Sequence, residues 1–392
     1  MKIYYKNWRL FLIFLFLFFS IAAIVSRMVY VQVEQGNFLL QKGNNQNTSE
    51  RVIKFKRGSI YDKNGIPLAI SITGFDLFAL SGLSEDDFLK IKNTLKLNDL
   101  EYKSFNKKSL IKNSLSFEEM RKVRSLRIDR LELEKTYKRH YPLGEQVAPL
   151  VGFSGRDGYG LEGLEKSYNS ILTGKPLKER VLRDGARSTI QRLEVLEFGE
   201  NSKDIYLTID SNIQYIAYKY LVEAIKNNDG TGGTVIILDN SAKEVLALAS
   251  YPSYNPNNPM RSIKKNRAFL ESYEPGSIVK PLALAGAIEK NLIDIDTELE
   301  LPIKIEVDGN IINDRKKYGQ LKAYEIIKES SQVGATQISF LLGAERLIDN
   351  YKKFGFSKPV NINFPSTSFG EINSRDEISD IEIATLGYGY GL

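Results

Sequence analysis

A serine and a lysine near residue 280 have the spacing of a catalytic pair. The segment Tyr273–Lys280 reads YEPGSIVK, which puts Ser277 three positions before Lys280. A Pro-Gly turn precedes the pair, and an apolar, helix-forming run follows it. Residues with this spacing share one face of a helix, so the lysine amine can lie beside the serine hydroxyl. The pattern predicts a serine nucleophile that a lysine activates.

The composition favours a serine–lysine pair over a site built on histidine or cysteine. His140 is the only histidine and the chain has no cysteine, so a Ser-His-Asp triad, a thiol nucleophile and a thiolate metal site are all hard to build. Ser-x-x-Lys is nevertheless a weak pattern, because it occurs four times: Ser104 to Lys107, Ser109 to Lys112, Ser262 to Lys265 and Ser277 to Lys280. Only the last copy lies between a turn and an apolar helix. Its lysine needs burial or a nearby cation to become neutral, since the ordinary pKa is about 10.4.

An apolar segment near the N-terminus predicts a membrane anchor at residues 10–33. Residues 10–25 read LFLIFLFLFFSIAAIV, and a span needs roughly 20 such residues. Lys2, Lys6 and Arg9 precede the segment, which predicts a cytoplasmic N-terminus for residues 1–9 and a body outside the membrane. A cleaved signal peptide is the alternative, although Ala22-Ala23 offers a poor cleavage site.

The remaining elements predict an α+β fold with more than one domain. Arg57–Ala69 is typical of a β-hairpin that turns at Asn64-Gly65, and the Lys-, Leu- and Glu-rich stretch 84–135 is typical of helices. A periodic apolar pattern after Asp210 predicts a helix with that residue as its N-cap. Two β-strands that form a hairpin, Thr234–Asp239 and Glu244–Ser250, are expected next. The net charge of +6 is spread among acids and shows no stripe for nucleic acid.

Several segments together resemble the class B penicillin-binding proteins, which are membrane-anchored D,D-transpeptidases of peptidoglycan. The matching segments, in chain order, are RGSIYD at 57–62, RHYPLG at 139–144, VGF at 151–153, GLEG at 160–163, NRA at 266–268, YEPGS at 273–277, SSQVG at 330–334, FGF at 354–356 and GYGYG at 387–391. The resemblance implies a β-rich pedestal or dimerisation domain at 34–204. It implies a transpeptidase domain at 205–392, with helices packed on an antiparallel sheet. Arg139 and Glu162 are expected to hold the pedestal together.

The resemblance also implies a mechanism and a set of site residues. Ser277 would attack the carbonyl between the two terminal D-alanines of a stem peptide, with Lys280 as its base. Ser330 would relay the proton to the leaving amine, and Gln332 would help to bind the substrate. β-Lactams imitate D-Ala-D-Ala and would acylate Ser277, and no metal or organic cofactor is needed. The expected partners are a membrane glycosyltransferase and other division proteins at the bacterial cytoplasmic membrane.

Two departures from the family pattern bear on activity. Gln332 stands where the family has asparagine, which adds one methylene to a positioning group. The third family motif, Lys-Thr-Gly or Lys-Ser-Gly, does not occur in the 392 residues, which end just after the Tyr-Gly-Tyr-Gly segment that precedes it in the family. The resemblance therefore implies a transpeptidase domain without its last part.

Three other interpretations stay open beside the septal, cell-division transpeptidase. The first is a catalytically inactive membrane scaffold of the division machinery, which Gln332 and the absent third motif favour and the intact Ser277, Lys280 and Ser330 oppose. The second is an elongation-type transpeptidase, which the Glu-Pro-Gly-Ser form of the first motif and the short pedestal disfavour. The third is a relative that hydrolyses or senses β-lactams, which the pedestal motifs disfavour.

Overall fold

The computed structural model describes residues 7–38, 48–97, 101–155, 157–183, 189–259, 265–372 and 378–392. Its elements form an α+β fold, as expected from the sequence. The chain divides into two compact units. The first contains Met1–Gly58 and Ser170–Asp204, and the second contains Ser59–Asn169 and Ile205–Leu392.

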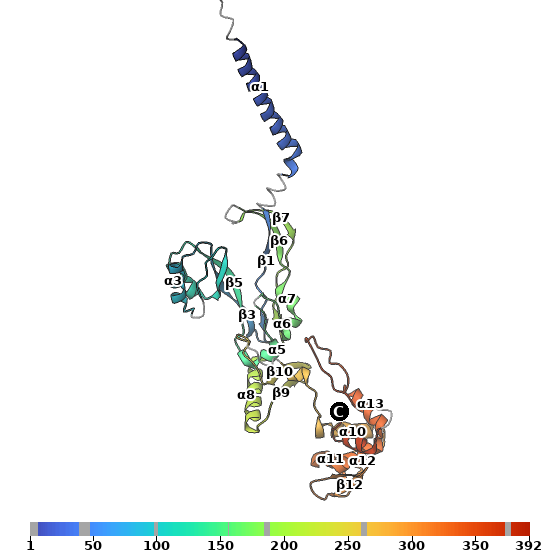
Figure 1. Ribbon diagram of the computed structural model, residues 1–392. Coiled ribbons are helices and arrows are strands. Elements are labelled where there is room, and N and C mark those ends of the chain that lie inside the picture. Colours follow the sequence, from blue (N-terminus) through green and yellow to red (C-terminus); the bar gives the residue numbers. More distant parts are fainter. Residues whose placement is uncertain are drawn as a thin grey trace, which may run out of the picture. The chain divides into compact units, whose positions relative to one another are not determined.

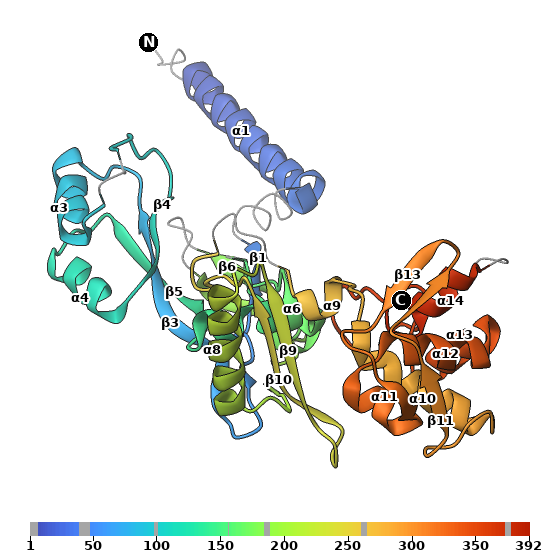
Figure 2. The same ribbon diagram turned by 90° about the horizontal axis from the view of Figure 1, so that it is seen from below.

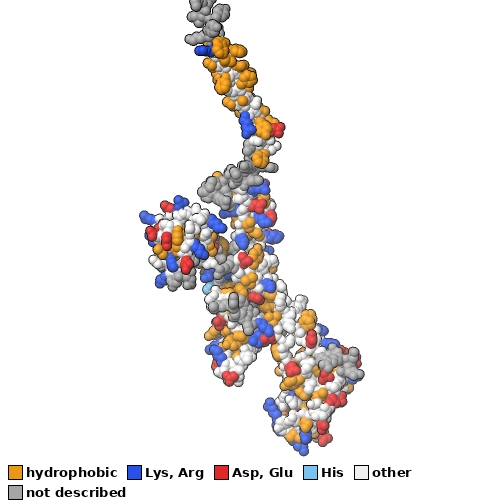
Figure 3. Space-filling model, viewed as in Figure 1, with side chains coloured by type: hydrophobic (Ala, Val, Ile, Leu, Met, Phe, Trp, Pro, Cys, Tyr) orange, Lys and Arg blue, Asp and Glu red, His pale blue; other side chains and the backbone are white. Residues whose placement is uncertain are grey.

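The first unit contains a long apolar helix and a small sheet. Helix α1 (Asn7–Val29) continues into a π-helical turn at Tyr30–Glu34, and the span Trp8–Glu34 is long and apolar enough to cross a membrane. Apolar side chains cover its surface (Figure 3). Strands β1 (Thr48–Ile53), β6 (Leu177–Arg183) and β7 (Thr189–Glu197) form an antiparallel sheet in the order β1-β6-β7 (Figure 1). Helix α7 (Asn169–Thr173) precedes β6.

A second sheet opens the second unit. Its strands are β2 (Ile60–Tyr61), β3 (Pro67–Ala79), β4 (Ser109–Leu115), β5 (Leu131–His140) and β8 (Ile205–Tyr206), in the order β4-β3-β2-β8 with β5 also paired to β3. The expected hairpin is confirmed, because β2 and β3 are antiparallel and Gly65 in their turn has φ +81°. A residue with a Cβ would be strained in that backbone conformation, whereas glycine is not.

The prediction of helices throughout 84–135 is partly wrong. Helices α3 (Glu85–Leu95) and α4 (Phe117–Ser125) are present, but β4 and the start of β5 lie in the same stretch, and residues 98–100 lie outside the described part. The composition suits a helix, but Ile111 and Leu115 of β4 are buried in the core that β3 shares with α3. Strand pairing and this burial outweigh the local preference.

A buried ion pair joins the end of β5 to a short helix in this unit. Arg139 at the end of β5 places its Nε 2.7 Å from Oε1 of Glu165, and the two side chains are 7% and 0% exposed. Glu165 belongs to the short helix α6 (Gly163–Ser167), which follows α5 (Ala148–Val151). The expected bracing role of Arg139 agrees with this geometry. The acid that meets it is Glu165 and not the neighbouring Glu162, which sequence spacing alone could not decide.

The predicted helix and hairpin after Asp210 are confirmed. Helix α8 (Ser211–Asn227) begins with the Asp210 carboxylate accepting from the backbone of Asn212 and Ile213. Strands β9 (Gly233–Asp239) and β10 (Glu244–Tyr251) form the antiparallel hairpin. Helix α8 lies along this hairpin (Figure 2), and its apolar side chains pack against alanines of β10.

The C-terminal half of the second unit is a helical cluster around one apolar core. Its helices are a 3₁₀ turn at Gly276–Val279, α10 (Lys280–Glu289), α11 (Ala323–Glu329), α12 (Gln332–Leu342), α13 (Ala344–Lys353) and α14 (Asp380–Leu386). Two small hairpins join them, β11 (Glu298–Leu301) with β14 (Gly319–Lys322) and β12 (Lys304–Val307) with β13 (Asn310–Asn313). Helix α9 (Arg267–Leu270) lies outside this core, because its Phe269 packs with Leu248 of β10. Helices α10, α11 and α12 and the turn before α10 contribute Val279, Ala283, Ala287, Ile326, Val333 and Ile338 to the core.

Candidate active site

The turn before α10 presents Ser277 to solvent. Ser277 is exposed in the 3₁₀ turn, and Gly276 before it has φ +64°. The Gly276 amide donates to the carbonyl of Gly389 (3.0 Å), and the Gly391 amide donates to Glu274 Oε1 (2.9 Å). The Tyr-Gly-Tyr-Gly segment thus supports the turn through its backbone. A Cβ on Gly389 would lie 2.0 Å from the Gly276 oxygen, so this contact requires glycine.

Lys280 begins α10 and is buried beside the second motif. Its side chain is among the largest fully buried ones, at 2% relative exposure. The amine donates to the Ser330 carbonyl (2.6 Å) and to the Ser330 hydroxyl (3.1 Å). Burial lowers the pKa of Lys280 to about 8; the charge of Asp314 opposes this and that of Arg315 adds to it. The expected neutral form of Lys280 needs burial or a nearby cation, and the structure provides both, with Arg315 as the cation.

The direct pairing expected between Ser277 and Lys280 is not a hydrogen bond in this structure. The amine bonds to Ser330, and the Ser277 hydroxyl makes no hydrogen bond to any described residue. The 3₁₀ turn leaves the serine exposed, whereas the lysine enters the core as the first residue of the α-helix. The two residues therefore lie on either side of a change of helix type, which the spacing could not reveal.

Ser330 and Ser331 link α11 to α12. Ser330 is exposed and has φ +55°, the left-handed conformation that ends a helix. Ser331 is buried and caps α12, since its Oγ accepts from the Gly334 amide at 2.8 Å. The sharp turn at Ser330 directs its carbonyl and its hydroxyl to the Lys280 amine.

Asp314 anchors this second motif, and sequence reasoning missed it. It is 6% exposed and lies just after β13. Its Oδ2 accepts from the Ser331 hydroxyl (2.6 Å), and its Oδ1 accepts from the amides of Gln332 (2.6 Å) and Val333 (3.3 Å). These bonds satisfy donors at the start of α12, where a negative charge is favoured. No motif marks the residue, and no strand is expected before it; the only available signal was an aspartate after the short apolar run Ile311-Ile312.

Gln332 is the first residue of α12. Its backbone amide is held by Asp314, and its side chain is half-buried. Within the described part of the chain the side-chain amide makes no hydrogen bond. It is thus available to a ligand, although nothing in the fold fixes its direction.

The two other Ser-x-x-Lys copies that the structure describes do not form comparable sites. The Ser104 hydroxyl bonds to Asn106, and Ser109 donates to the carbonyl of Lys107. Lys112 is paired with Glu119 at 2.7 Å on the surface. Ser262 lies outside the described residues.

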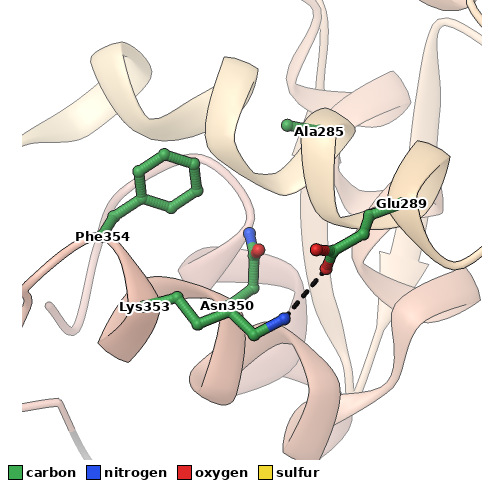
Figure 4. A pocket seen from close by; sticks show the side chains of 5 residues that line it. All are labelled: Ala285, Glu289, Asn350, Lys353 and Phe354. Carbon is green, nitrogen blue, oxygen red and sulfur yellow. Dashed lines mark hydrogen bonds and ion pairs between the residues drawn. The ribbon is translucent and has the colours of Figure 1, made fainter.

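A shallow hollow of about 270 Å³ lies on the opposite side of α10 (Figure 4). It is lined by Ala285, Glu289, Asn350, Lys353 and Phe354, and the Glu289–Lys353 pair (2.9 Å) lies at its edge. Positions five and nine residues after Lys280 lie about 140° and 180° around the helix from it. The hollow is therefore separate from the serine and lysine site.

The α+β fold places the buried Lys280 amine against the Ser330 hydroxyl, three residues after the exposed Ser277. The Penicillin binding protein transpeptidase domain family matches residues 233–392, and the Penicillin-binding Protein dimerisation domain family matches 52–207. The chain is 34% identical to the probable peptidoglycan D,D-transpeptidase PenA of Neisseria gonorrhoeae, over 95% of this chain and 66% of that protein. It is 30% identical to the peptidoglycan D,D-transpeptidase FtsI of Buchnera aphidicola subsp. Schizaphis graminum, over 100% of this chain and 72% of that protein.

A solved structure has the same fold. Penicillin-Binding Protein PBP2 from Helicobacter pylori, determined in a complex with MreC, matches with a TM-score of 0.72 at 22% identity, over 88% of this chain and 73% of that chain. This chain belongs to the class B penicillin-binding proteins. It spans about two thirds of the length of the gonococcal relative.

Proposed function

We propose that this chain is a peptidoglycan D,D-transpeptidase whose nucleophile is Ser277. The observation that carries the proposal is the buried Lys280 amine, bonded to Ser330 and with its pKa lowered to about 8. At pH 7 a lysine of that pKa is neutral in roughly a tenth of the molecules, against well under a thousandth at the ordinary value. A neutral amine in this position can accept the serine proton.

The proposed reaction has two acyl-transfer steps. The Ser277 oxygen attacks the carbonyl between the terminal D-alanines and its proton passes to Lys280. An ester forms, the C–N bond breaks, and the departing D-alanine amine takes a proton that Lys280 supplies through the Ser330 hydroxyl. An amine of a neighbouring stem peptide then attacks the ester, forms the cross-link and releases the Ser277 hydroxyl. The turn from Glu274 to Gly276, held by the Tyr-Gly-Tyr-Gly backbone, presents the nucleophile.

Domain limits, location and partners complete the proposal. Residues 34–204 would form the pedestal and 205–392 the transpeptidase domain. Helix α1 would anchor the chain in the bacterial cytoplasmic membrane with residues 1–9 inside, because Lys2, Lys6 and Arg9 precede it. Relatives named FtsI support a role in cell division. A membrane glycosyltransferase and other division proteins would be the partners. β-Lactams would acylate Ser277 as they imitate D-Ala-D-Ala.

A second candidate function is a membrane scaffold without catalysis. Gln332, in place of the family's asparagine and with its side-chain amide unfixed, favours it, because a positioning error of about 1 Å can cost on the order of 100-fold in rate. The low pKa of the Lys280 amine favours the transpeptidase instead. A scaffold has no need to bury a lysine beside a hydroxyl.

Labelling with a fluorescent penicillin separates the two functions. The transpeptidase predicts covalent labelling of the detergent-solubilised chain that Ser277→Ala removes and that the matched variant Ser104→Ala leaves unchanged. A chain that takes no label under conditions that label other penicillin-binding proteins would support the scaffold. Equal labelling of the Ser277→Ala variant would refute the assignment of the nucleophile.

A further inference from the structure

A basic loop between β13 and β14 lies along the second motif. Three alternate residues of the loop contact that motif or the residue before it. Asp314 holds Ser331 and the start of α12. Lys316 Nζ lies 3.2 Å from Glu329 Oε2, and the Tyr318 hydroxyl lies 3.4 Å from the Glu329 carbonyl. Because Glu329 directly precedes Ser330, these contacts fix the loop relative to the active site.

The two residues between these contacts, Arg315 and Lys317, are exposed cations. Neither forms an ion pair with any described residue. Asp314 and Glu329 are already engaged, Asp314 by the motif and Glu329 by Lys316. Arg315 directly follows Asp314, whose carboxylate bonds to Ser331 and Gln332, so the backbone of Arg315 lies beside the second motif.

We propose that Arg315, with Lys317 beside it, is a subsite for a carboxylate of the stem peptide. The inference rests on the proposed transpeptidase function and names a specificity residue for it. A planar guanidinium binds a carboxylate through two parallel hydrogen bonds, which an ammonium cannot do. The bonds of Asp314 hold the backbone that carries Arg315 beside the second motif before the peptide arrives.

Stem peptides offer two sources of this chemistry, the C-terminal carboxylate and the internal carboxylates. The test therefore uses three synthetic pentapeptides: the parent stem peptide, its C-terminal carboxamide, and a version with only its internal carboxylates amidated. Binding is measured by NMR titration at pH 6 on the full chain carrying Ser277→Ala. No acyl-enzyme forms in this background, and Lys280 stays protonated whether or not Arg315 is present.

We expect Arg315→Gln to weaken binding of the parent peptide by roughly 10-fold, as for the loss of one charge-assisted contact. One of the two amidated peptides lacks the carboxylate that Arg315 binds, and Arg315→Gln should not change the affinity for that peptide. Arg315→Lys should give an intermediate loss. Lys290→Gln is the matched control and should have no effect. It removes one exposed cation just after α10, about 15 Å along the helix axis from Lys280.

Equal weakening of all three peptides, or of none, overturns the subsite, and so does a chain that fails to bind the parent peptide at several millimolar. Far-UV circular dichroism of each variant checks that the fold is intact. Penicillin labelling of the unsubstituted chain tests the proposed function separately. If the chain is labelled but Arg315→Gln affects all three peptides equally, only the subsite is refuted. If Arg315→Gln distinguishes the peptides but the chain takes no label, only the catalytic function is refuted.

Discussion

Replacing Lys280 by methionine should stabilise the folded chain while abolishing acylation. The lysine is almost fully buried, and its pKa falls from 10.5 to about 8. Such a shift corresponds to about 3 kcal/mol, at about 1.4 kcal/mol per unit, which the fold loses by holding a charge there. Methionine removes that loss and fills similar volume. It also gives up the bonds to Ser330, which contribute roughly 1 kcal/mol, so the expected net gain near pH 7 is about 2 kcal/mol.

The gain should depend on pH in a defined direction. The folded protein binds the Lys280 proton less tightly than the unfolded chain does. Below pH 8 the buried charge therefore lowers the free energy of unfolding by its full amount. This loss then shrinks as the pH rises, and it vanishes near the unfolded value of 10.5. The advantage of Lys280→Met should therefore be large at pH 7 and absent at pH 10.5.

Urea unfolding followed by circular dichroism at pH 7, 9 and 10.5 measures this difference. Lys290→Met, an exposed position just beyond the same helix, is the control and should change stability little at any pH. A Lys280→Met chain that is less stable than the wild type at pH 7 would refute the reasoning. So would a stability difference that does not change with pH.

Three further predictions follow from the geometry. Asp314→Asn weakens the acceptor of three hydrogen bonds at the second motif. We expect penicillin acylation to slow by roughly 10- to 100-fold without a change in the circular dichroism spectrum. An unchanged acylation rate would contradict the positioning role of Asp314. Gly389→Ala places a Cβ 2.0 Å from the Gly276 backbone oxygen and should slow acylation at least about 10-fold. Gly391→Ala is the control and should slow acylation far less, because Gly391 has a similar positive φ but the nearest atom to its Cβ is at 3.8 Å. Equal effects of the two variants would refute the steric argument. Arg139→Ala leaves Glu165 buried without this cation and should lower the free energy of unfolding by about 3–5 kcal/mol in urea titrations, and a loss below about 1 kcal/mol would show that the pair is not a brace.

Much of the scaffold could be predicted from local patterns. The periodicity after Asp210, the hairpin at Asn64-Gly65 and the apolar run at the N-terminus are each decided by neighbouring residues, and the structure contains all of them. The stretch 84–135 was harder, because β4 is a strand only by virtue of its pairing with β3. The composition of the whole stretch, rich in Lys, Leu and Glu, favours helices.

The candidate site residues could be selected from the sequence, but the contacts between them could not. The Pro-Gly turn and the apolar helix distinguished Ser277 and Lys280 from three other copies of the same spacing. The bonds from Lys280 to Ser330 span fifty positions, and Asp314 reaches the second motif from a separate hairpin. No local signal encodes such contacts, because they arise when the helices and hairpins pack around one core.

The most direct test of the account is to identify the residue that penicillin acylates. The full chain is treated with benzylpenicillin at pH 8, digested, and its peptides are analysed by mass spectrometry. We predict a single penicilloyl adduct on Ser277, and none after Ser277→Ala. An adduct on another serine, or no adduct at a concentration that saturates other penicillin-binding proteins, would contradict the assignment of Ser277 and Lys280 as the acyl-transfer site.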